Sequence, residues 1–267
     1  MITYCPDLPS WQRLRASPDW AGRRIGFVPT MGALHAGHAA LLARARAEND
    51  RVVLSIFVNP TQFNDPADLA KYPRTLEADL DLARPFADAV FAPPAEAMYP
   101  DGYRYQVTEN DLSTRGEGLH RPGHFEGVLT VVLKLFQIVR PDRAYFGEKD
   151  WQQLQLVRGM VDAFFLPLTV VPCPTVRDPD GVALSSRNRR LSPAARARLA
   201  HFPALLRRAA NAAEAAAQLR EEGFEVDYVD DRDRHRIGAI RLEGVRLIDH
   251  FPVEPAPAVE PEPRDAL

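Results

Sequence analysis

The sequence predicts an α/β fold, in which a parallel sheet covered by helices on both faces is followed by a second, smaller α+β domain. Apolar runs of strand length alternate with helical patterns through most of the chain, as is typical of parallel sheets. The composition changes after Pro174, where an Arg-rich loop and an Ala-rich helical stretch begin. A length of 267 residues, with 46% hydrophobic residues, suits one large domain or two modest ones.

The first strand–helix–strand unit lies between residues 24 and 58. An apolar run at 24–28 leads into a Pro/Gly-rich turn at 29–38, and an Ala/Leu/Arg-rich helix then connects to a second apolar run at 52–58. Ligands of parallel sheets collect at the carboxyl ends of the strands. The loops at 29–38 and 59–64 both follow strand ends, so they are the first candidate ligand-binding segments.

The alternation continues as far as residue 171. Thr75 is the predicted N-cap of a helix over 75–87, since Pro73 breaks the chain just before it. Apolar residues at i, i+3, i+4 and i+7 predict a helix over 126–139 that Pro141 stops. The other predicted elements are strands at 89–92, 144–146 and 168–171, a loop at 147–150 and a helix over 151–164.

The segment after Pro174 predicts the smaller domain. It combines a helical stretch over 193–222, started by Ser192 and Pro193, with β-like runs at 224–229 and 237–248. The last residues are rich in Pro and Glu and carry almost no large apolar side chain, so burial cannot offset their ordering entropy. We therefore predict a main domain over 1–174, a smaller domain over 175–252 and a disordered tail over 253–267.

Charge and composition argue against several protein classes. The net charge of −3 disfavours a nucleic-acid partner. The chain starts without a basic segment followed by an apolar one, and no apolar run reaches about 18 residues, so we expect a cytoplasmic protein with no membrane partner. Cys5 and Cys173 lie far apart and lack metal-ligand spacing, so we expect ordinary thiols, without a disulfide or a structural zinc site.

His35 and His38 lie three residues apart where a strand-end loop turns into a helix. At this spacing their imidazoles share a face, and the free amides of a helix start attract phosphate. The pair therefore indicates an anion site. The plainer interpretation is that one histidine caps the turn and the other is solvated.

Lys149 is one of only three lysines among 33 basic residues, and it follows a predicted strand. Its compact ammonium suits a phosphate oxygen as a point charge. An exposed loop lysine is the alternative. For Asp150 and Gln153 the alternative is structural, because an aspartate N-cap with glutamine three residues later resembles a capping box.

Residues 177–198 carry six arginines against two aspartates, which suits phosphate contacts but is also typical of a solvated face. Likewise, 59–62 and 121–124 could be ordinary turns. The chain lacks the GxGxxG, GxxxxGK[ST] and GxSxG motifs of dinucleotide-binding proteins, P-loop NTPases and α/β-hydrolases. The HxGH segment remains as the leading candidate site.

Six blocks in chain order carry a more specific signal, and together they resemble the pantothenate synthetase (pantoate–β-alanine ligase) family from about residue 25 to 192. The blocks are Pro29–His38, Val58–Phe63, Tyr72–Arg74, Arg121–Phe125, Phe146–Gln153 and Leu184–Asn188.

The resemblance implies a Rossmann-like, doubly wound main domain of the HxGH nucleotidyltransferase superfamily, a small C-terminal lid and a homodimer. It also implies the reaction. Pantoate and ATP give pantoyl adenylate and pyrophosphate, and β-alanine then displaces AMP to give pantothenate. ATP is thus a substrate, with Mg²⁺ expected beside it, and no separate protein metal site is implied.

The implied ATP-binding residues form three segments. The first is Met31, Gly32, Ala33, Leu34, His35, Ala36, Gly37 and His38; the second is Gly147, Glu148, Lys149 and Asp150; the third is a lid strip of Val176, Leu184, Ser185, Ser186 and Arg187.

The resemblance also implies individual roles. His38 is the implied proton donor and His35 its phosphate-binding companion, while Lys149 meets phosphate and Asp150 the ribose. The catalytic set is therefore His35, His38, Lys149 and Arg187, acting with Mg²⁺. Gln62 and Gln153 are the implied pantoate ligands, with Gln62 also lining the β-alanine position. Arg121 and His124 are weaker candidates for orienting a loop or an acidic substrate.

The chain departs from the family pattern near its C-terminus, where 226–250 looks abbreviated and His250 follows Asp249 in place of the more usual asparagine. Two other functions stay open at this point. One is an HxGH nucleotidyltransferase with another small substrate, and the other is a nucleotide-binding module that has lost catalysis. The acidic charge balance disfavours tRNA as a substrate, and the Gln62 and Gln153 pair favours a small hydroxy acid.

Overall fold

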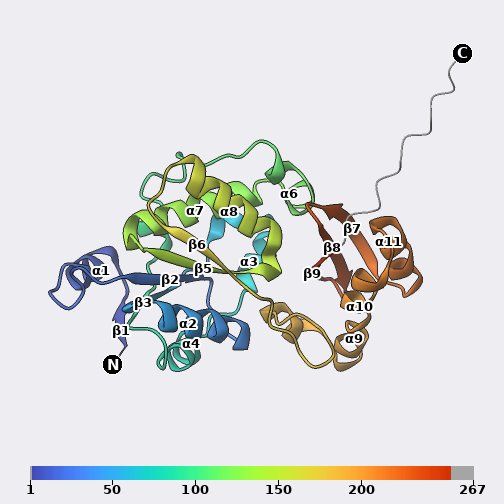
Figure 1. Cartoon of the computed structure of the whole chain (residues 1–267), viewed down its shortest axis with the longest axis horizontal. Coiled ribbons are helices and arrows are strands. Elements are labelled where there is room, and N and C mark those ends of the chain that lie inside the picture. Colours follow the sequence, from blue (N-terminus) through green and yellow to red (C-terminus); the bar gives the residue numbers. More distant parts are fainter. Residues whose placement is uncertain (1, 254–267) are drawn as a thin grey trace, which may run out of the picture.

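The computed structural model describes residues 2–253, and Figure 1 shows its two separate sheets. The larger sheet is entirely parallel and has the strand order β1-β4-β3-β2-β5-β6. Its strands are β1 (Thr3–Cys5), β2 (Ile25–Thr30), β3 (Arg51–Ile56), β4 (Ala89–Phe91), β5 (Arg143–Gly147) and β6 (Thr169–Cys173). The predicted parallel α/β sheet is confirmed.

Helices cover both faces of this sheet, because successive strand residues point to opposite faces and both sets are apolar. Phe27 and Val53 face one core, with side chains of α1, α7 and α8, whereas Val28 and Leu54 face another, with side chains of α2 and α4. These helices are α1 (Leu8–Arg15), α2 (Ala36–Glu48), α4 (Leu76–Ala83), α7 (His124–Val139) and α8 (Trp151–Ala163). The sheet is therefore doubly wound, as predicted.

Short helical turns fill the loops that follow the strands. They are η1 (Pro60–Gln62), α3 (Pro66–Ala70), α5 (Ala95–Met98), η2 (Leu112–Thr114), α6 (Glu117–His120), η3 (Glu148–Asp150) and η4 (Ser186–Arg190). The chain order reverses between the adjacent strands β2 and β5, since β3 continues on one side of β2 and β6 on the far side of β5. Such a switch point leaves a crevice outside the carboxyl ends of the two strands.

The C-terminal unit has its own antiparallel sheet of β7 (Glu225–Arg232), β8 (His235–Leu242) and β9 (Val245–Pro252). Its helices are α9 (Pro193–Arg198), α10 (His201–Arg208) and α11 (Ala212–Glu221). Phe202, Leu206, Leu219 and Ile240 pack into a separate apolar core. The predicted α+β composition of this part is confirmed.

The structure divides two of the segments predicted for the C-terminal part. The helical stretch over 193–222 is three helices, and α10 and α11 are separated because Ala209 is extended and Asn211 caps a new start by accepting the amide of Glu214. The run over 237–248 is not one strand but parts of two, because Glu243 and Gly244 both adopt positive φ, at 50° and 72°. Two adjacent positive-φ residues form the kind of turn that joins antiparallel strands.

The N-terminal elements β1 and α1 were not predicted. β1 is only three residues long, and it pairs with β4 at the edge of the sheet. Thr75 does precede α4, but it makes no capping hydrogen bond; its hydroxyl instead donates to Asp79 Oδ1 at 3.2 Å. Ser192 caps α9 as expected, accepting the amide of Ala195.

Both cysteines are free, buried thiols in the structure, as expected. Within residues 2–253, no helix is both long and apolar enough to cross a bilayer. The predicted disordered tail lies outside the described residues, except for Val253.

Candidate active site

A cleft of about 240 Å³ opens at the switch point, beyond the carboxyl ends of β2 and β5. Several segments that lie far apart in the chain line it together. The predicted site residues along it are Met31, His35, Gly37, His38, Gln62, Arg121, His124, Gly147, Lys149, Asp150, Gln153, Val176, Leu184, Ser185, Ser186 and Arg187. Gly32, Ala33, Leu34, Ala36 and Glu148 do not line the cleft, although they belong to the loops that form it.

His35 and His38 both cap helix α2. Nδ1 of His35 accepts the amide of Gly37 at 3.1 Å, and Nδ1 of His38 accepts the amide of His35 at 3.3 Å. The rings lie 4.1 Å apart. Each Nδ1 acts as an acceptor, so the neutral rings carry their protons on Nε2. The plainer interpretation from the sequence, in which only one histidine caps the turn, is wrong.

The pKa values of both imidazoles are depressed. Burial, reinforced by the positive charge of Lys149, lowers the pKa of His35 to about 4. Burial, reinforced by His35, lowers the pKa of His38 to about 3. Both rings are therefore neutral at pH 7 in the ligand-free protein, and each can offer an Nε2–H donor to an anion.

Asp79 on α4 fixes the loop that leads to these histidines. Its buried carboxylate accepts the amides of Ala33 at 3.0 Å and Leu34 at 2.7 Å. Ala33 and Gly32 both have positive φ, and a side chain on Gly32 would come within 2.9 Å of Asp79 Oδ2. The role of Asp79 is not predictable from the sequence, since an aspartate in an amphipathic helix carries no signal of its distant partners.

Lys149 projects from η3, directly after β5, and its side chain is only 17% exposed. Its ammonium lies 3.6 Å from the carboxylate of Asp150. Desolvation raises the pKa of Asp150, but Lys149 and Arg187 more than offset it and hold that pKa below its usual value. The second loop of the site therefore places a cation and a carboxylate side by side.

Gln62 is held from two directions. Its side-chain Oε1 accepts Asn59 Nδ2 at 2.9 Å, and its backbone carbonyl accepts His124 Nδ1 at 2.9 Å and Arg121 Nη2 at 3.2 Å. From the sequence, Arg121 and His124 are only weak candidates, and Asn59 has no predicted role. All three turn out to position Gln62.

Gln153 and Gln152 behave differently although they are neighbours. Asp150 makes no capping hydrogen bond at the start of α8, so the alternative that Asp150 and Gln153 form a capping box is wrong. Gln153 lines the cleft. Gln152 is buried and structural, because its amide accepts the backbone N–H of Glu117 and donates to the carbonyls of Leu112 and Arg115.

The strip from Val176 to Arg187 closes one side of the cleft. The amide of Leu184 donates to the carbonyl of Val176 at 3.0 Å, so the two ends of the strip lie together. Ser185 caps the following 3-10 turn. Arg187 at the end of the strip and Arg190 just beyond it both pair with Asp68 on α3, at 3.8 and 2.7 Å, which ties this end of the strip to the segment after β3. Part of the Arg-rich segment over 177–198 thus forms ion pairs with the rest of the protein, so the segment is not simply a solvated face.

Within residues 2–253, no group of three or more His, Cys, Asp or Glu side chains is arranged to hold a metal ion. Of the described residues, Asp150 is the only acidic one that lines the cleft. A cation in this cleft would therefore depend mainly on ligands supplied by a bound molecule.

Comparison with known proteins gives one consistent result. The family model described as pantoate-beta-alanine ligase matches residues 5–252. The pantothenate synthetase of Bdellovibrio bacteriovorus is 54% identical over 248 residues, covering 92% of this chain and 96% of that protein. The corresponding protein of Legionella pneumophila is 47% identical, covering 92% of this chain and 97% of its own length.

Solved structures agree with the sequence relatives. The pantoate-beta-alanine ligase of Francisella tularensis, complexed with beta-gamma ATP and beta-alanine, is 39% identical and superimposes with a TM-score of 0.89. It covers 94% of this chain and 98% of its own. The pantothenate synthetase of Thermus thermophilus is 42% identical with a TM-score of 0.85, covering 95% of this chain and 100% of its own.

Proposed function

The chain belongs to the pantoate–β-alanine ligase family, and from that premise we propose how its own residues share the work of the reaction. The enzyme condenses pantoate with β-alanine to pantothenate. ATP first activates pantoate as pantoyl adenylate, releasing pyrophosphate, and β-alanine then displaces AMP. The alternative functions, another small substrate or a silent nucleotide-binding module, have no support among these relatives.

ATP occupies the cleft at the switch point in this proposal. The observation that carries it is that the loops after β2 and β5 bring His35, His38 and Lys149 to one cleft, which Arg187 of the strip also lines. Lys149 supplies a point charge for phosphate, and the two Nε2–H groups supply hydrogen bonds. Asp150 faces the ribose, and the serines of the strip meet the triphosphate.

Mg²⁺ enters with ATP as part of the substrate. Mg²⁺ is commonly held by substrate phosphates, water and one or two carboxylates, and the single carboxylate of Asp150 beside the cleft fits that pattern. When bound, the ion neutralises negative charge on the phosphates. The protein needs no dedicated metal cage for this role.

Gln62 and Gln153 bind pantoate, and Gln62 also lines the β-alanine position. Gln62 suits this role because Asn59 orients its side chain while Arg121 and His124 hold its backbone. Gln153 suits this role because no side-chain capping hydrogen bond is made at the start of α8. Two amides give directional hydrogen bonds to hydroxyl and carboxylate oxygens without adding charge.

Catalysis of the first step rests on position and charge. The pantoate carboxylate forms a bond to the α-phosphorus of ATP, and the bond to the pyrophosphate oxygen breaks. Two anions must approach each other, so Lys149 and Arg187 lower the barrier by neutralising charge that grows in the transition state, while His35 and His38 donate hydrogen bonds to it. His38 donates a hydrogen bond from its Nε2–H to the leaving oxygen. No enzyme nucleophile takes part.

In this proposal residues 175–252 form a lid, and residues 1–174 form the main domain, which carries most of the substrate-binding residues. The strip belongs to the lid and lines the ATP cleft, so closing the lid would exclude water from the reacting phosphates. We also propose that the protein is a cytoplasmic homodimer, as the family resemblance implies.

ATP–pyrophosphate exchange tests these assignments. Exchange that requires pantoate but not β-alanine, together with AMP release that requires both, is the expected result. ATP binding without exchange, or exchange that ignores pantoate, would contradict the proposed binding of pantoate by Gln62 and Gln153.

A further inference from the structure

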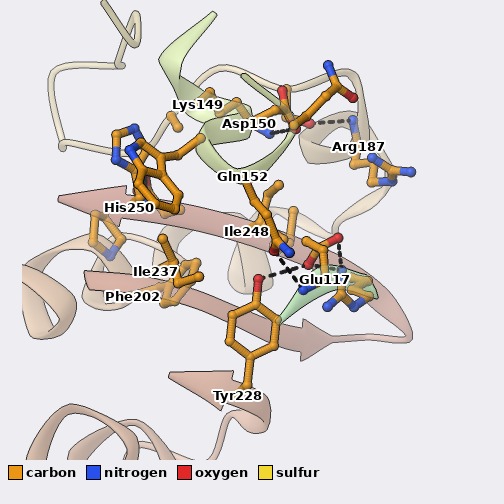
Figure 2. A pocket seen from close by; sticks show the side chains of 18 of the residues that line it. Glu117, Lys149, Asp150, Gln152, Arg187, Phe202, Tyr228, Ile237, Ile248 and His250 are labelled. Atoms are coloured by element: carbon orange, nitrogen blue, oxygen red, sulfur yellow. Dashed lines mark hydrogen bonds and ion pairs between the residues drawn. The ribbon is translucent and has the colours of Figure 1, made fainter. Parts of the chain in front are cut away.

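A buried carboxylate joins the lid to the main domain at a cavity of about 70 Å³ between them. Glu117 on α6 is 8% exposed at its side chain. Figure 2 shows it facing Tyr228 of β7, and it accepts hydrogen bonds from the Tyr228 hydroxyl at 3.1 Å and from Arg246 Nη1 at 2.7 Å. Charged pairs this far from water are strong only when their geometry is good, and here both partners lie within hydrogen-bond distance.

The same carboxylate also faces a cation of the main domain. Glu117 Oε2 lies 3.7 Å from Arg121 Nη1, one helical turn away on the chain. Arg121 is occupied elsewhere, because Nη1 lies 3.0 Å from His124 Nε2 and Nη2 donates to the carbonyl of Gln62. His124 donates from Nδ1 to that carbonyl, so its Nε2 accepts from Arg121. Glu117 therefore lies between a lid cation and the cation that holds Gln62.

Arg246 and Glu117 would keep different partners if the lid moved away. Arg246 keeps Asp227 inside the lid, with Nε donating at 2.5 Å, so it retains a counterion wherever the lid moves. Glu117 stays with the main domain, because Gln152 holds its backbone amide at 3.0 Å. If the lid withdrew, the nearest cation left for Glu117 would be Arg121. A desolvated carboxylate cannot stay unpaired without a large cost, so it would draw Arg121 toward itself.

We propose that Glu117 is a positioning residue that couples docking of the lid to the pantoate-binding side chain Gln62. With Arg246 and Tyr228 docked, Glu117 is satisfied and Arg121 is free to hold the carbonyl of Gln62. With the lid withdrawn, Glu117 competes for Arg121 and loosens that hold. By linkage, bound pantoate favours the docked lid to the same degree. The inference rests on the proposed function in one respect, that Gln62 binds pantoate.

A suppressor experiment on the full-length enzyme tests this coupling, with pantoate KM in ATP–pyrophosphate exchange as the readout. Arg246→Met removes the lid cation but keeps an unbranched side chain about as long as the aliphatic part of arginine, and it should raise the pantoate KM about tenfold, within the usual range of coupling between sites. Adding Glu117→Gln removes the competitor for Arg121, so the double variant should return to within about threefold of the wild-type KM.

Controls separate coupling from simple damage. Arg241→Met changes a neighbouring lid arginine that also pairs with Asp227 but makes no contact with Glu117, so the pantoate KM should stay at the wild-type value. Melting temperature and affinity for a non-hydrolysable ATP analogue show whether each variant is folded and still binds nucleotide.

The outcomes are distinct. A double variant as impaired as Arg246→Met, or more so, would overturn the coupling, since a purely structural pair gives no rescue. An unchanged KM in Arg246→Met would overturn it as well. Gln62→Ala with a wild-type pantoate KM would instead refute the proposed binding role of Gln62 and the coupling with it, whereas an impaired Gln62→Ala beside an uncoupled Arg246→Met would remove only the coupling.

Discussion

Asp79 Oδ1 lies 2.7 Å from the amide nitrogen of Leu34, and this single carboxylate holds the turn that leads to both histidines of the cleft. The second oxygen accepts the neighbouring amide of Ala33. The turn contains a non-glycine residue at positive φ, so it needs external hydrogen bonds to keep its shape. The position of the histidines therefore depends on a side chain that does not touch the cleft.

Asp79→Ala should raise the KM for ATP about tenfold or more and should lower the melting temperature. The change leaves two buried amides without acceptors, each at a cost of roughly 1–3 kcal/mol. Steady-state kinetics and thermal unfolding measure both effects. Asp81→Asn is the control, since Asp81 lies on the same helix but is 68% exposed. An Asp79→Ala enzyme with normal ATP kinetics would show that the turn holds its shape unaided.

Lys149→Ala should reduce the rate of adenylate formation by roughly 10²–10³-fold with little change in melting temperature. Removing one preorganised donor to a developing anion has effects of this size. Single-turnover measurement of pyrophosphate release isolates the step. Lys71→Ala removes an exposed lysine elsewhere in the main domain and should leave the rate unchanged. Near-normal adenylate formation in Lys149→Ala would refute its assignment to the phosphates.

Substitutions of the adjacent residues Gln152 and Gln153 should affect different properties, stability for Gln152 and pantoate binding for Gln153. Gln153→Ala should raise the pantoate KM and leave the melting temperature unchanged, since its amide makes no cap at α8. Gln152→Ala should lower the melting temperature, because it removes one acceptor and two donor contacts from a buried loop. Parallel kinetics and thermal unfolding compare the two. A stability loss confined to Gln153→Ala would reverse the assignment.

The stability of the ligand-free protein should fall as the pH drops from about 6.5 toward 4. Burial lowers the pKa of His35 and His250 to about 4 and of His38 and His124 to about 3. Below pH 6.5 these histidines bind protons in the unfolded chain but stay neutral in the folded protein. Each such histidine therefore weakens folding by up to roughly 1.4 kcal/mol per pH unit. Urea unfolding at a series of pH values measures the slope.

His250→Asn should make this pH dependence shallower. Neither ring nitrogen of His250 has a hydrogen-bond partner among the described residues, and burial, reinforced by His235 and Arg177, keeps the ring neutral. His201→Asn changes a half-exposed histidine and is the control. If the slope of His250→Asn matched that of the wild type, the folded protein would have to accept a proton at His250.

Much of the fold could be predicted because its signals are local. A strand buried on both faces is apolar throughout, and a helix on a sheet repeats its apolar residues every three to four positions, so β2, β3 and α7 are clear in the sequence. The three-residue strand β1 is too short to show either pattern. The turn at Glu243 and Gly244 was missed because apolar residues continue on both sides of it.

The candidate site was also partly predictable, because the loops that follow strand ends carry its charged and polar residues. The roles of Asp79 and Glu117 could not be predicted from the sequence, and the reason is the same for both. Each lies outside the cleft and acts on backbone or side chains far along the chain, 45 residues away for Asp79 and Leu34 and 129 for Glu117 and Arg246.

Most of the order of strands and helices, the chemistry of the loops at their ends and the family to which those motifs belong follow from the amino-acid sequence without coordinates. Three features emerged only from the folded chain: the partner that each buried charge received, the distinct surroundings of Gln152 and Gln153, and the capping of one helix by both histidines. Periodicity and turn residues encode neighbours along the chain. Hydrogen bonds and ion pairs depend instead on distance and on exclusion of water, which exist only once distant segments pack together.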